Sequence, residues 1–281
     1  MKTFELNNKE LIPAVGFGVF MIPNDGPTYD ATLAALKAGY RHIDTAAGYM
    51  NESDVGKAIK DSGIDRKEIF ITSKLWLQDY GYENAKKGIE TSLKLLGVDY
   101  IDLYLLHQPY GDYLGSWRAL EEAVAQGKIK SIGISNVTIN LWNKFKDGMT
   151  IMPAVNQVEV NVFHQQIEAQ TYNEKYGVQL EAWAPFAEGK KGIFTNETLM
   201  GIGEKYNKSV GQVILRWLVQ RGIVPLAKSV KKERMQENIN IFDFELSKED
   251  MDKISEMDKK ESSFFSHYDP SIVEMIAGLH Q

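Results

Sequence analysis

The sequence contains no cysteine, and this absence excludes disulfides, thiolate catalysis and zinc sites with cysteine ligands. A chain without cysteine also fits the reducing cytosol. No apolar run reaches the roughly 18 residues that a membrane-spanning helix needs, and the first eight residues lack the apolar core of a secretory signal. We therefore expect a soluble cytoplasmic protein that does not bind membranes.

The chain also has no excess of positively charged residues. The 32 Lys and Arg residues are outnumbered by 38 Asp and Glu residues, and the net charge of −6 disfavours general binding to nucleic acids. The chain does have an ordinary globular composition, since 43% of its residues are hydrophobic and 25% are charged. Its 281 residues permit one or two domains, and α/β barrels often use this length as one.

Segments of strand character alternate with helical segments along most of the chain. A small hairpin is expected at 4–13, followed by strands at 16–20, 41–44, 69–73, 101–106, 129–134, 154–158, 178–183 and 223–226. Helices are expected at 31–38, 53–60, 83–96, 116–126, 138–145, 165–176, 197–206, 209–220 and 231–240. Eight such units without a linker predict one α/β domain over residues 1–281, a (β/α)8 TIM barrel.

A doubly wound sheet is the competing architecture. No Gly-x-Gly-x-x-Gly stands in a strand-to-helix turn, so nothing favours a Rossmann cofactor site. Beyond Asn240 we expect one extra C-terminal helix, Ser247 to Met257, with Ser247 as its N-cap and Asp250 three residues later. The aromatic segment 262–268 is expected to fold over the barrel mouth as a loop that contacts the substrate.

Four side chains that could take part in acid–base chemistry lie at or just after the ends of three predicted strands. Asp44 ends the segment Gly39-Tyr40-Arg41-His42-Ile43-Asp44, Tyr49 lies in the next loop, and Lys74 and His107 follow the strands at 69–73 and 101–106. In an α/β barrel these positions form the catalytic rim. Taken alone, Asp44 could cap a helix or pair with a core cation, Lys74 could lie on the surface, Tyr49 could serve packing, and His107 could be a loop histidine.

Together, the four residue types solve one chemical problem. A phenol has a pKa of about 10 and is a poor acid at neutral pH. A neighbouring ammonium lowers that pKa, and a carboxylate bonded to the ammonium keeps it charged and in place. An imidazole can then orient the carbonyl oxygen of a substrate. The set predicts general acid catalysis toward an oxygen that gains negative charge.

One reaction in which an oxygen gains negative charge is the reduction of a carbonyl group, and this reaction needs a hydride as well as a proton. Without cysteine or an evident metal cluster, a diffusible nicotinamide is the economical source, and we expect no metal. Ser135, Asn136 and Gln157 end predicted strands five and six and could hold a carboxamide, while Trp183 could stack on the ring. Turn chemistry and barrel packing are the alternative explanation for these polar groups.

Several motifs in this order resemble the aldo-keto reductase superfamily, and the match extends along nearly the whole chain. They are the segments at 39–52, 72–76, 102–107, 133–136 and 153–157, together with Lys228-Ser229. The resemblance implies the catalytic set Asp44, Tyr49, Lys74 and His107, with Tyr49 as the proton donor in reduction. It is nearest to the bacterial branch of 2,5-diketo-D-gluconate reductases and broad α-dicarbonyl reductases, and it implies a monomer by default.

The resemblance also implies NADP(H) as the cofactor. Lys228, Ser229 and Arg234 would grip the 2′-phosphate, and Glu237 and Asn238 would face the adenine. Helix N-termini attract anions, and barrels commonly bind phosphate beyond strands seven and eight. A solvated charge run is the other explanation of these residues. A flexible loop at 184–192 would close on the pyrophosphate.

Three functions are compatible with these observations. The first is an NADP-dependent oxidoreductase acting on CH–OH groups, which reduces small-molecule aldehydes or ketones such as α-dicarbonyls or keto-sugars. The others are a non-catalytic nicotinamide-binding regulatory subunit and an unrelated barrel hydrolase or isomerase that uses Asp44 and His107. Candidate pocket walls for a substrate are aromatic or apolar apart from His107, and they are Phe20, Met21, Trp76, His107, Tyr110, Phe264 and Phe265.

Overall fold

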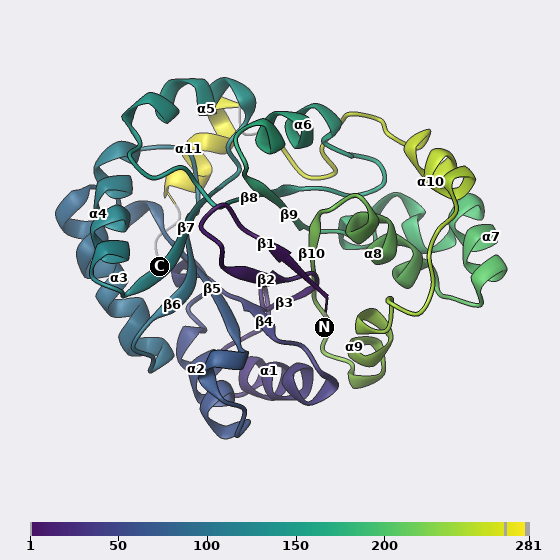
Figure 1. Cartoon of the computed structure of the whole chain (residues 1–281), viewed down its shortest axis with the longest axis horizontal. Coiled ribbons are helices and arrows are strands. Elements are labelled where there is room, and N and C mark those ends of the chain that lie inside the picture. Colours follow the sequence, from purple (N-terminus) through teal and green to yellow (C-terminus); the bar gives the residue numbers. More distant parts are fainter. Residues whose placement is uncertain (1, 267–268, 279–281) are drawn as a thin grey trace.

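The computed structural model describes residues 2–266 and 269–278, and its centre is a closed barrel of parallel strands ringed by helices (Figure 1). Around the barrel the strands follow the order β10-β3-β4-β5-β6-β7-β8-β9. Their bounds are β3 Gly16–Gly18, β4 His42–Asp44, β5 Phe70–Leu75, β6 Ile101–Leu106, β7 Ile129–Ser135, β8 Val155–Glu159, β9 Gln179–Trp183 and β10 Val224–Ala227. The predicted (β/α)8 barrel is confirmed, and a doubly wound open sheet is excluded because the strands close on themselves.

The helices that cover the strands lie close to their predicted positions. They are α1 Pro27–Ala38, α2 Glu52–Asp61, α3 Tyr82–Leu96, α4 Tyr113–Ala125, α5 Ile139–Phe145, α6 Ile167–Lys175, α7 Glu197–Tyr206, α8 Val210–Gln220 and α9 Lys232–Ile239. Helix α1 begins at Pro27, earlier than predicted, because proline suits the first helical position. Gly39 and Gly97 end α1 and α3 in the left-handed conformation, with φ of 109° and 64°.

The N-terminal hairpin covers one end of the barrel. Strands β1 (Thr3–Glu5) and β2 (Leu11–Pro13) pair antiparallel as predicted and cross the middle of the ring in Figure 1. The Asn7 amide donates to the Pro153 carbonyl at 2.9 Å and the Asn8 amide to the Lys130 carbonyl at 3.0 Å. Both carbonyls lie near the starts of β7 and β8, so the rim at the C-terminal strand ends stays uncovered by the hairpin.

Two helices follow the barrel. Helix α10 (Lys248–Ser255) begins as predicted, because the Ser247 hydroxyl accepts from the Asp250 backbone N–H at 3.2 Å. Helix α11 (Pro270–Gly278) was not predicted, since the one extra helix expected from the sequence was Ser247 to Met257 and the expected loop ended at 268. Residues 267 and 268 of that expected loop lie outside the described residues. Across the described ranges, no helix is both long enough and apolar enough to cross a membrane.

Helix α2 connects the loop of Tyr49 to the strand of Lys74. Its first residue, Glu52, is buried and accepts a hydrogen bond of 2.5 Å from the Ser73 hydroxyl on β5. At Gly56 the helix lies directly against the end of α3, where an added Cβ would lie 2.2 Å from the Leu96 carbonyl oxygen. This close approach fixes α2, and with it the chain that enters from Tyr49.

We expect Gly56→Ala to lower the free energy of unfolding by about 1–3 kcal/mol, the usual cost of overpacking. Gly201→Ala in α7 is the matched control, because nothing lies within 4 Å of its added Cβ. Replacing a helical glycine by alanine there should stabilise by about 0.5–1 kcal/mol. Urea unfolding followed by circular dichroism measures both. Stabilisation by both substitutions would contradict the close contact of α2 with α3.

Candidate active site

The four residues predicted to act together meet at the C-terminal rim of the barrel. Asp44 is the last residue of β4, and Lys74 lies within β5, which extends two residues beyond its predicted end. Tyr49 ends a 3-10 turn that follows β4, and His107 directly follows β6. Asp44, Lys74 and His107 are buried, and Tyr49 is partly buried.

A buried ion pair forms the centre of this group. The Lys74 ammonium lies 2.7 Å from Asp44 Oδ1, donates to the Thr45 carbonyl at 2.8 Å and reaches the Tyr49 hydroxyl at 3.4 Å. The second Asp44 oxygen accepts from Gln157 Nε2 at 2.9 Å. Burying a charge is costly unless it is paired and hydrogen-bonded, and here both charges are.

Aromatic rings surround the phenol and the imidazole. The rings of Tyr49 and His107 meet edge to face with centroids 5.6 Å apart. Trp76 packs 4.9 Å from His107, and Phe20 packs 4.9 Å from Tyr49. Three of the predicted pocket walls, Phe20, Trp76 and His107, are therefore brought together. Tyr110 lies in the loop after β6, where burial raises its pKa to about 12.

The net effect on the Tyr49 pKa differs from the sequence expectation. Burial raises the pKa of Tyr49, and the nearby Lys74 ammonium lowers it, as expected, but less than burial raises it. The Tyr49 pKa therefore lies above its ordinary value. Burial lowers the pKa of Lys74, but Asp44 and Tyr49 outweigh that effect, and the Lys74 pKa is raised. The ammonium thus stays charged beside a neutral phenol at neutral pH, which is the state a proton donor needs.

The polar groups predicted to hold a nicotinamide are linked along neighbouring strand ends. The Ser135 hydroxyl donates to the Gln157 carbonyl at 2.9 Å, and the Trp183 indole donates to Asn136 Oδ1 at 2.9 Å. Asn136 Nδ2 in turn donates to the His107 carbonyl at 3.2 Å. Among the described residues Gln157 Oε1 accepts no hydrogen bond, so it is available to the N–H of a carboxamide. These residues fit such a ring.

The residues predicted to hold the phosphate end lie around the start of α9. Lys228 and Arg234 are exposed and form no ion pair with any described residue. The Ser229 hydroxyl accepts from the Lys231 backbone N–H at 3.1 Å. These groups fit an anion. Glu237 accepts from the hydroxyl of Ser209, which caps α8, and Asn238 is buried.

The C-terminal tail reaches the rim beside Trp183. The Phe264 ring packs 5.3 Å from Trp183, and the Lys190 ammonium lies 3.9 Å from the centre of the Phe264 ring. Glu159 anchors this part of the tail, because it accepts from the Ser262 hydroxyl at 2.6 Å and the Ser263 backbone N–H at 2.9 Å. The tail therefore covers part of the mouth, as the sequence predicted, and Lys190 connects it to the loop after β9.

Two buried carboxyl groups, one at the rim and one beneath it, were missed in the sequence. Glu159 and Glu181 are 4% and 0% exposed, and each lies in a strand of otherwise mainly apolar or amide residues. The available signal was the charge itself, since an acidic residue inside a buried strand needs a partner. For Glu181 the two-residue period of a strand also places it on the same face as Trp183.

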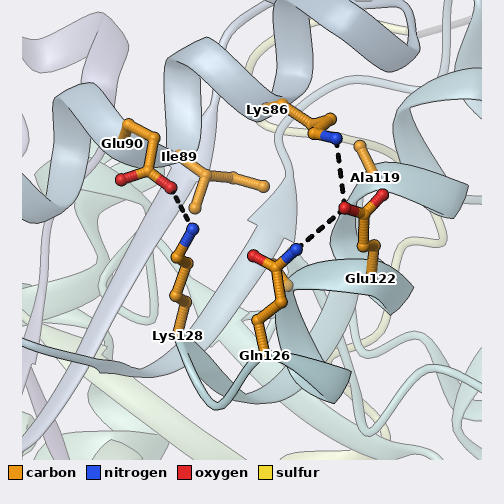
Figure 2. A pocket seen from close by; sticks show the side chains of 8 residues that line it. Lys86, Ile89, Glu90, Ala119, Glu122, Gln126 and Lys128 are labelled. Carbon is orange, nitrogen blue, oxygen red and sulfur yellow. Dashed lines mark hydrogen bonds and ion pairs between the residues drawn. The ribbon is translucent and has the colours of Figure 1, made fainter.

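A pocket on the outside of the barrel is separate from this site. Figure 2 shows it between α3 and α4, where Lys86 and Gln126 contact Glu122 and Lys128 contacts Glu90. Its polar side chains are paired with one another, and none of its residues belongs to the rim. We assign no function to it.

Comparison with known proteins identifies close relatives over almost the whole chain. Glyoxal reductase of Bacillus subtilis is 48% identical over 260 residues, which cover 92% of this chain and 94% of that protein. Methylglyoxal reductase DkgA of Escherichia coli is 37% identical over 258 residues, 91% of this chain and 93% of that one.

Solved structures agree with this relationship. The crystal structure of the silkworm (Bombyx mori) aldo-keto reductase AKR2E5 complexed with NADPH superposes with a TM-score of 0.88 at 33% identity, and covers 96% of this chain and 90% of that one. The family described as "Aldo/keto reductase family" matches residues 15–259. The resemblance inferred from the motifs is confirmed, and the chain belongs to the aldo/keto reductase family.

Proposed function

We propose that the protein reduces small aldehydes or ketones to alcohols with NADPH, and that Tyr49 is the general acid. The observation that carries this proposal is the buried Lys74 ammonium, which is bonded to Asp44 at 2.7 Å and reaches the Tyr49 hydroxyl at 3.4 Å. Catalytic hydrogen bonds are often long in the absence of substrate, so 3.4 Å is compatible with this role.

In this proposal, bound NADPH supplies the hydride to the carbonyl carbon. Tyr49 donates its proton to the carbonyl oxygen as negative charge develops there. Lys74 stabilises the phenolate that remains, and Asp44 keeps Lys74 charged and in place. His107 hydrogen-bonds the carbonyl oxygen and orients it beside the phenol. The partly buried ring of Tyr49 and the buried ring of Trp76 limit water at the reacting atoms.

The cofactor would lie across the second half of the rim. Gln157, Ser135 and Asn136 would hold the carboxamide, and Trp183 would stack on the ring. At the other end Lys228, Ser229 and Arg234 would bind the 2′-phosphate, beside Glu237 and Asn238 at the adenine. Lys228 and Arg234, which are exposed and form no ion pair with any described residue, support this assignment, and so does the relative whose structure contains NADPH.

Small α-dicarbonyl compounds are the proposed substrate class. Two relatives of high identity are named glyoxal reductase and methylglyoxal reductase. The rim combines aromatic walls with a polar group, Gln108, directly after His107. Keto-sugars remain a second candidate class on the sequence resemblance. The monomeric state and the cytoplasmic location stay predictions from the sequence.

Tyr49→Phe should reduce kcat for methylglyoxal by at least about 10²–10⁴-fold, the usual contribution of general acid catalysis. It should leave NADPH binding within about threefold, because the ring and its neighbours remain. Tyr29→Phe is the matched control, since it removes a hydroxyl that bonds Asp61 on the outer surface. NADPH oxidation and a fluorescence titration measure the two effects.

The two rival functions give different results in the same assay. A regulatory subunit would bind NADPH but show no turnover with any carbonyl compound, and Tyr49→Phe would change nothing. A hydrolase or isomerase would act without a nicotinamide. Turnover that needs NADPH and disappears with the Tyr49 hydroxyl separates the reductase from both.

Arg234→Met and Lys228→Met should each weaken NADPH binding by about 10–100-fold, the range expected for one hydrogen bond to a charged group. Their effect on NADH binding should be less than about threefold, because NADH has no 2′-phosphate. Lys232→Met removes a charge from the same helix and should affect neither. Equal losses for NADPH and NADH would contradict the phosphate assignment.

A further inference from the structure

Glu181 lies beneath the rim at the centre of the barrel. It is fully buried in β9, two residues before Trp183, so both side chains project from the same face of that strand. In the register of β8 with β9, Glu181 stands directly opposite Gln157. The sequence therefore brings a carboxyl group beside the amide that is proposed to hold the nicotinamide.

Gln157 uses one nitrogen atom to contact two carboxyl groups. Its Nε2 donates to Glu181 Oε2 at 2.7 Å and to Asp44 Oδ2 at 2.9 Å. An amide nitrogen carries two hydrogens, so both donors of the side chain are used. If the oxygen and nitrogen of the amide exchanged places, the oxygen would face the carboxyl oxygens of Glu181 and Asp44, and no hydrogen would lie between them. The two carboxyl groups thus fix which end of the Gln157 amide faces the rim.

Glu181 has no other strong interaction within the described ranges. The bond from Gln157 is its single hydrogen bond there, and Oε1 has no hydrogen-bond partner. His42 Nε2 lies 3.6 Å from Oε1 and contacts the Thr72 hydroxyl at 2.9 Å. Burial lowers the pKa of His42 to about 3, so this ring is neutral and does not balance a carboxylate. Burying a carboxyl group with only one hydrogen bond costs free energy. In the part of the chain that the structure describes, the one group that Glu181 holds in place by a hydrogen bond is the Gln157 amide.

We propose that Glu181 is a positioning residue for the cofactor: together with Asp44 it occupies both N–H groups of Gln157, so that the amide oxygen faces the nicotinamide carboxamide. This inference rests on the proposed function, in which Gln157 binds that group. The Gln157 amide oxygen is a hydrogen-bond acceptor, so it can bond only to the NH2 group of the nicotinamide carboxamide. Glu181 thereby contributes to the orientation of the ring without touching it.

The charge state of Glu181 gives a second, independent readout. Burial and, after it, Asp44 raise the pKa of Glu181 to about 8. The groups that face it are His42 and Asp44 from β4, Lys74 from β5 and Gln157 from β8, and the charge of Glu181 in turn raises the pKa of Tyr49. Burial also raises the pKa of Asp44, and the pKa values of Lys74 and Tyr49 lie above their ordinary values; Glu181, with a pKa of about 8, ionises between pH 7 and pH 9.

Ionisation of Glu181 adds a negative charge beneath the rim as the pH rises through about 8. That charge favours the oxidised nicotinamide ring, which is cationic, over the neutral reduced ring. The 2′-phosphate is common to both forms, so its own ionisation cancels in the ratio of their affinities. The hydrogen bond from Gln157 persists throughout, because Oε2 accepts in either charge state.

A double-mutant cycle on cofactor binding tests the positioning role. Glu181→Leu should weaken NADPH binding, measured by tryptophan fluorescence, by about tenfold, the effect of one ordinary hydrogen bond. In a Gln157→Leu background the same change should have less than about a twofold effect. Glu181→Gln keeps an acceptor and should bind within about threefold of wild type. Glu52→Gln, which alters a buried carboxyl away from Gln157, is the matched control and should bind normally.

The pH arm uses the well-tolerated Glu181→Gln protein. In the wild type, the affinity for NADP+ relative to NADPH should rise between pH 7 and pH 9, and in Glu181→Gln it should stay constant. The inference would be overturned, with the proposed function left standing, by either of two results. One is an equal tenfold loss of NADPH affinity from Glu181→Leu in the wild-type and Gln157→Leu backgrounds, and the other is the same pH response in the wild type and in Glu181→Gln. A wild-type protein that bound neither NADP+ nor NADPH would overturn both the inference and the proposed function. If Tyr49→Phe binds NADPH normally and loses turnover, the proposed function stands whatever the result for Glu181.

Discussion

The buried ion pair of Lys74 and Asp44 is the interaction on which the rest of the site depends. An ammonium that is fully buried would lose its proton without a counter-charge, and Asp44 at 2.7 Å supplies one. The Thr45 carbonyl accepts a second hydrogen bond from the Lys74 ammonium, and Gln157 Nε2 donates a hydrogen bond to the other Asp44 oxygen. The charge next to the Tyr49 hydroxyl is therefore held in one place, and the phenolate that proton donation leaves behind would be stabilised there.

Closure of the barrel turns residues that are far apart in the sequence into one network. Asp44 and Gln157 are separated by 113 positions and contact each other across the interior of the barrel. Glu181 joins them because β9 pairs with β8 in a register that places it opposite Gln157. The same network reaches Trp183 through Ser135 and Asn136, so the acid–base side of the rim and the proposed ring-binding side share their supports.

Much of this arrangement follows from the sequence because strand ends are easy to locate. Asp44, Lys74 and His107 each follow an apolar run, and parallel strands in a barrel bring such ends together. The net direction of the Tyr49 pKa could not be predicted, because it depends on how deeply the phenol is buried. The contact of Glu181 with Gln157 depends on the strand register, which the sequence does not specify. Helix α11 was missed because its short segment, largely apolar with few charges, lacks the periodic polar face that marks a surface helix.

The central claim is that Lys74 lowers the pKa of Tyr49 against the effect of burial. The most direct test is the Tyr49 pKa itself, obtained as the difference between ultraviolet pH titrations of the protein and of its Tyr49→Phe variant. The measurement is then repeated in a Lys74→Met background. The account predicts a higher Tyr49 pKa without Lys74, because burial, Asp44 and Glu181, which then act on the phenol, all raise its pKa. An unchanged or lower pKa in that background would contradict it.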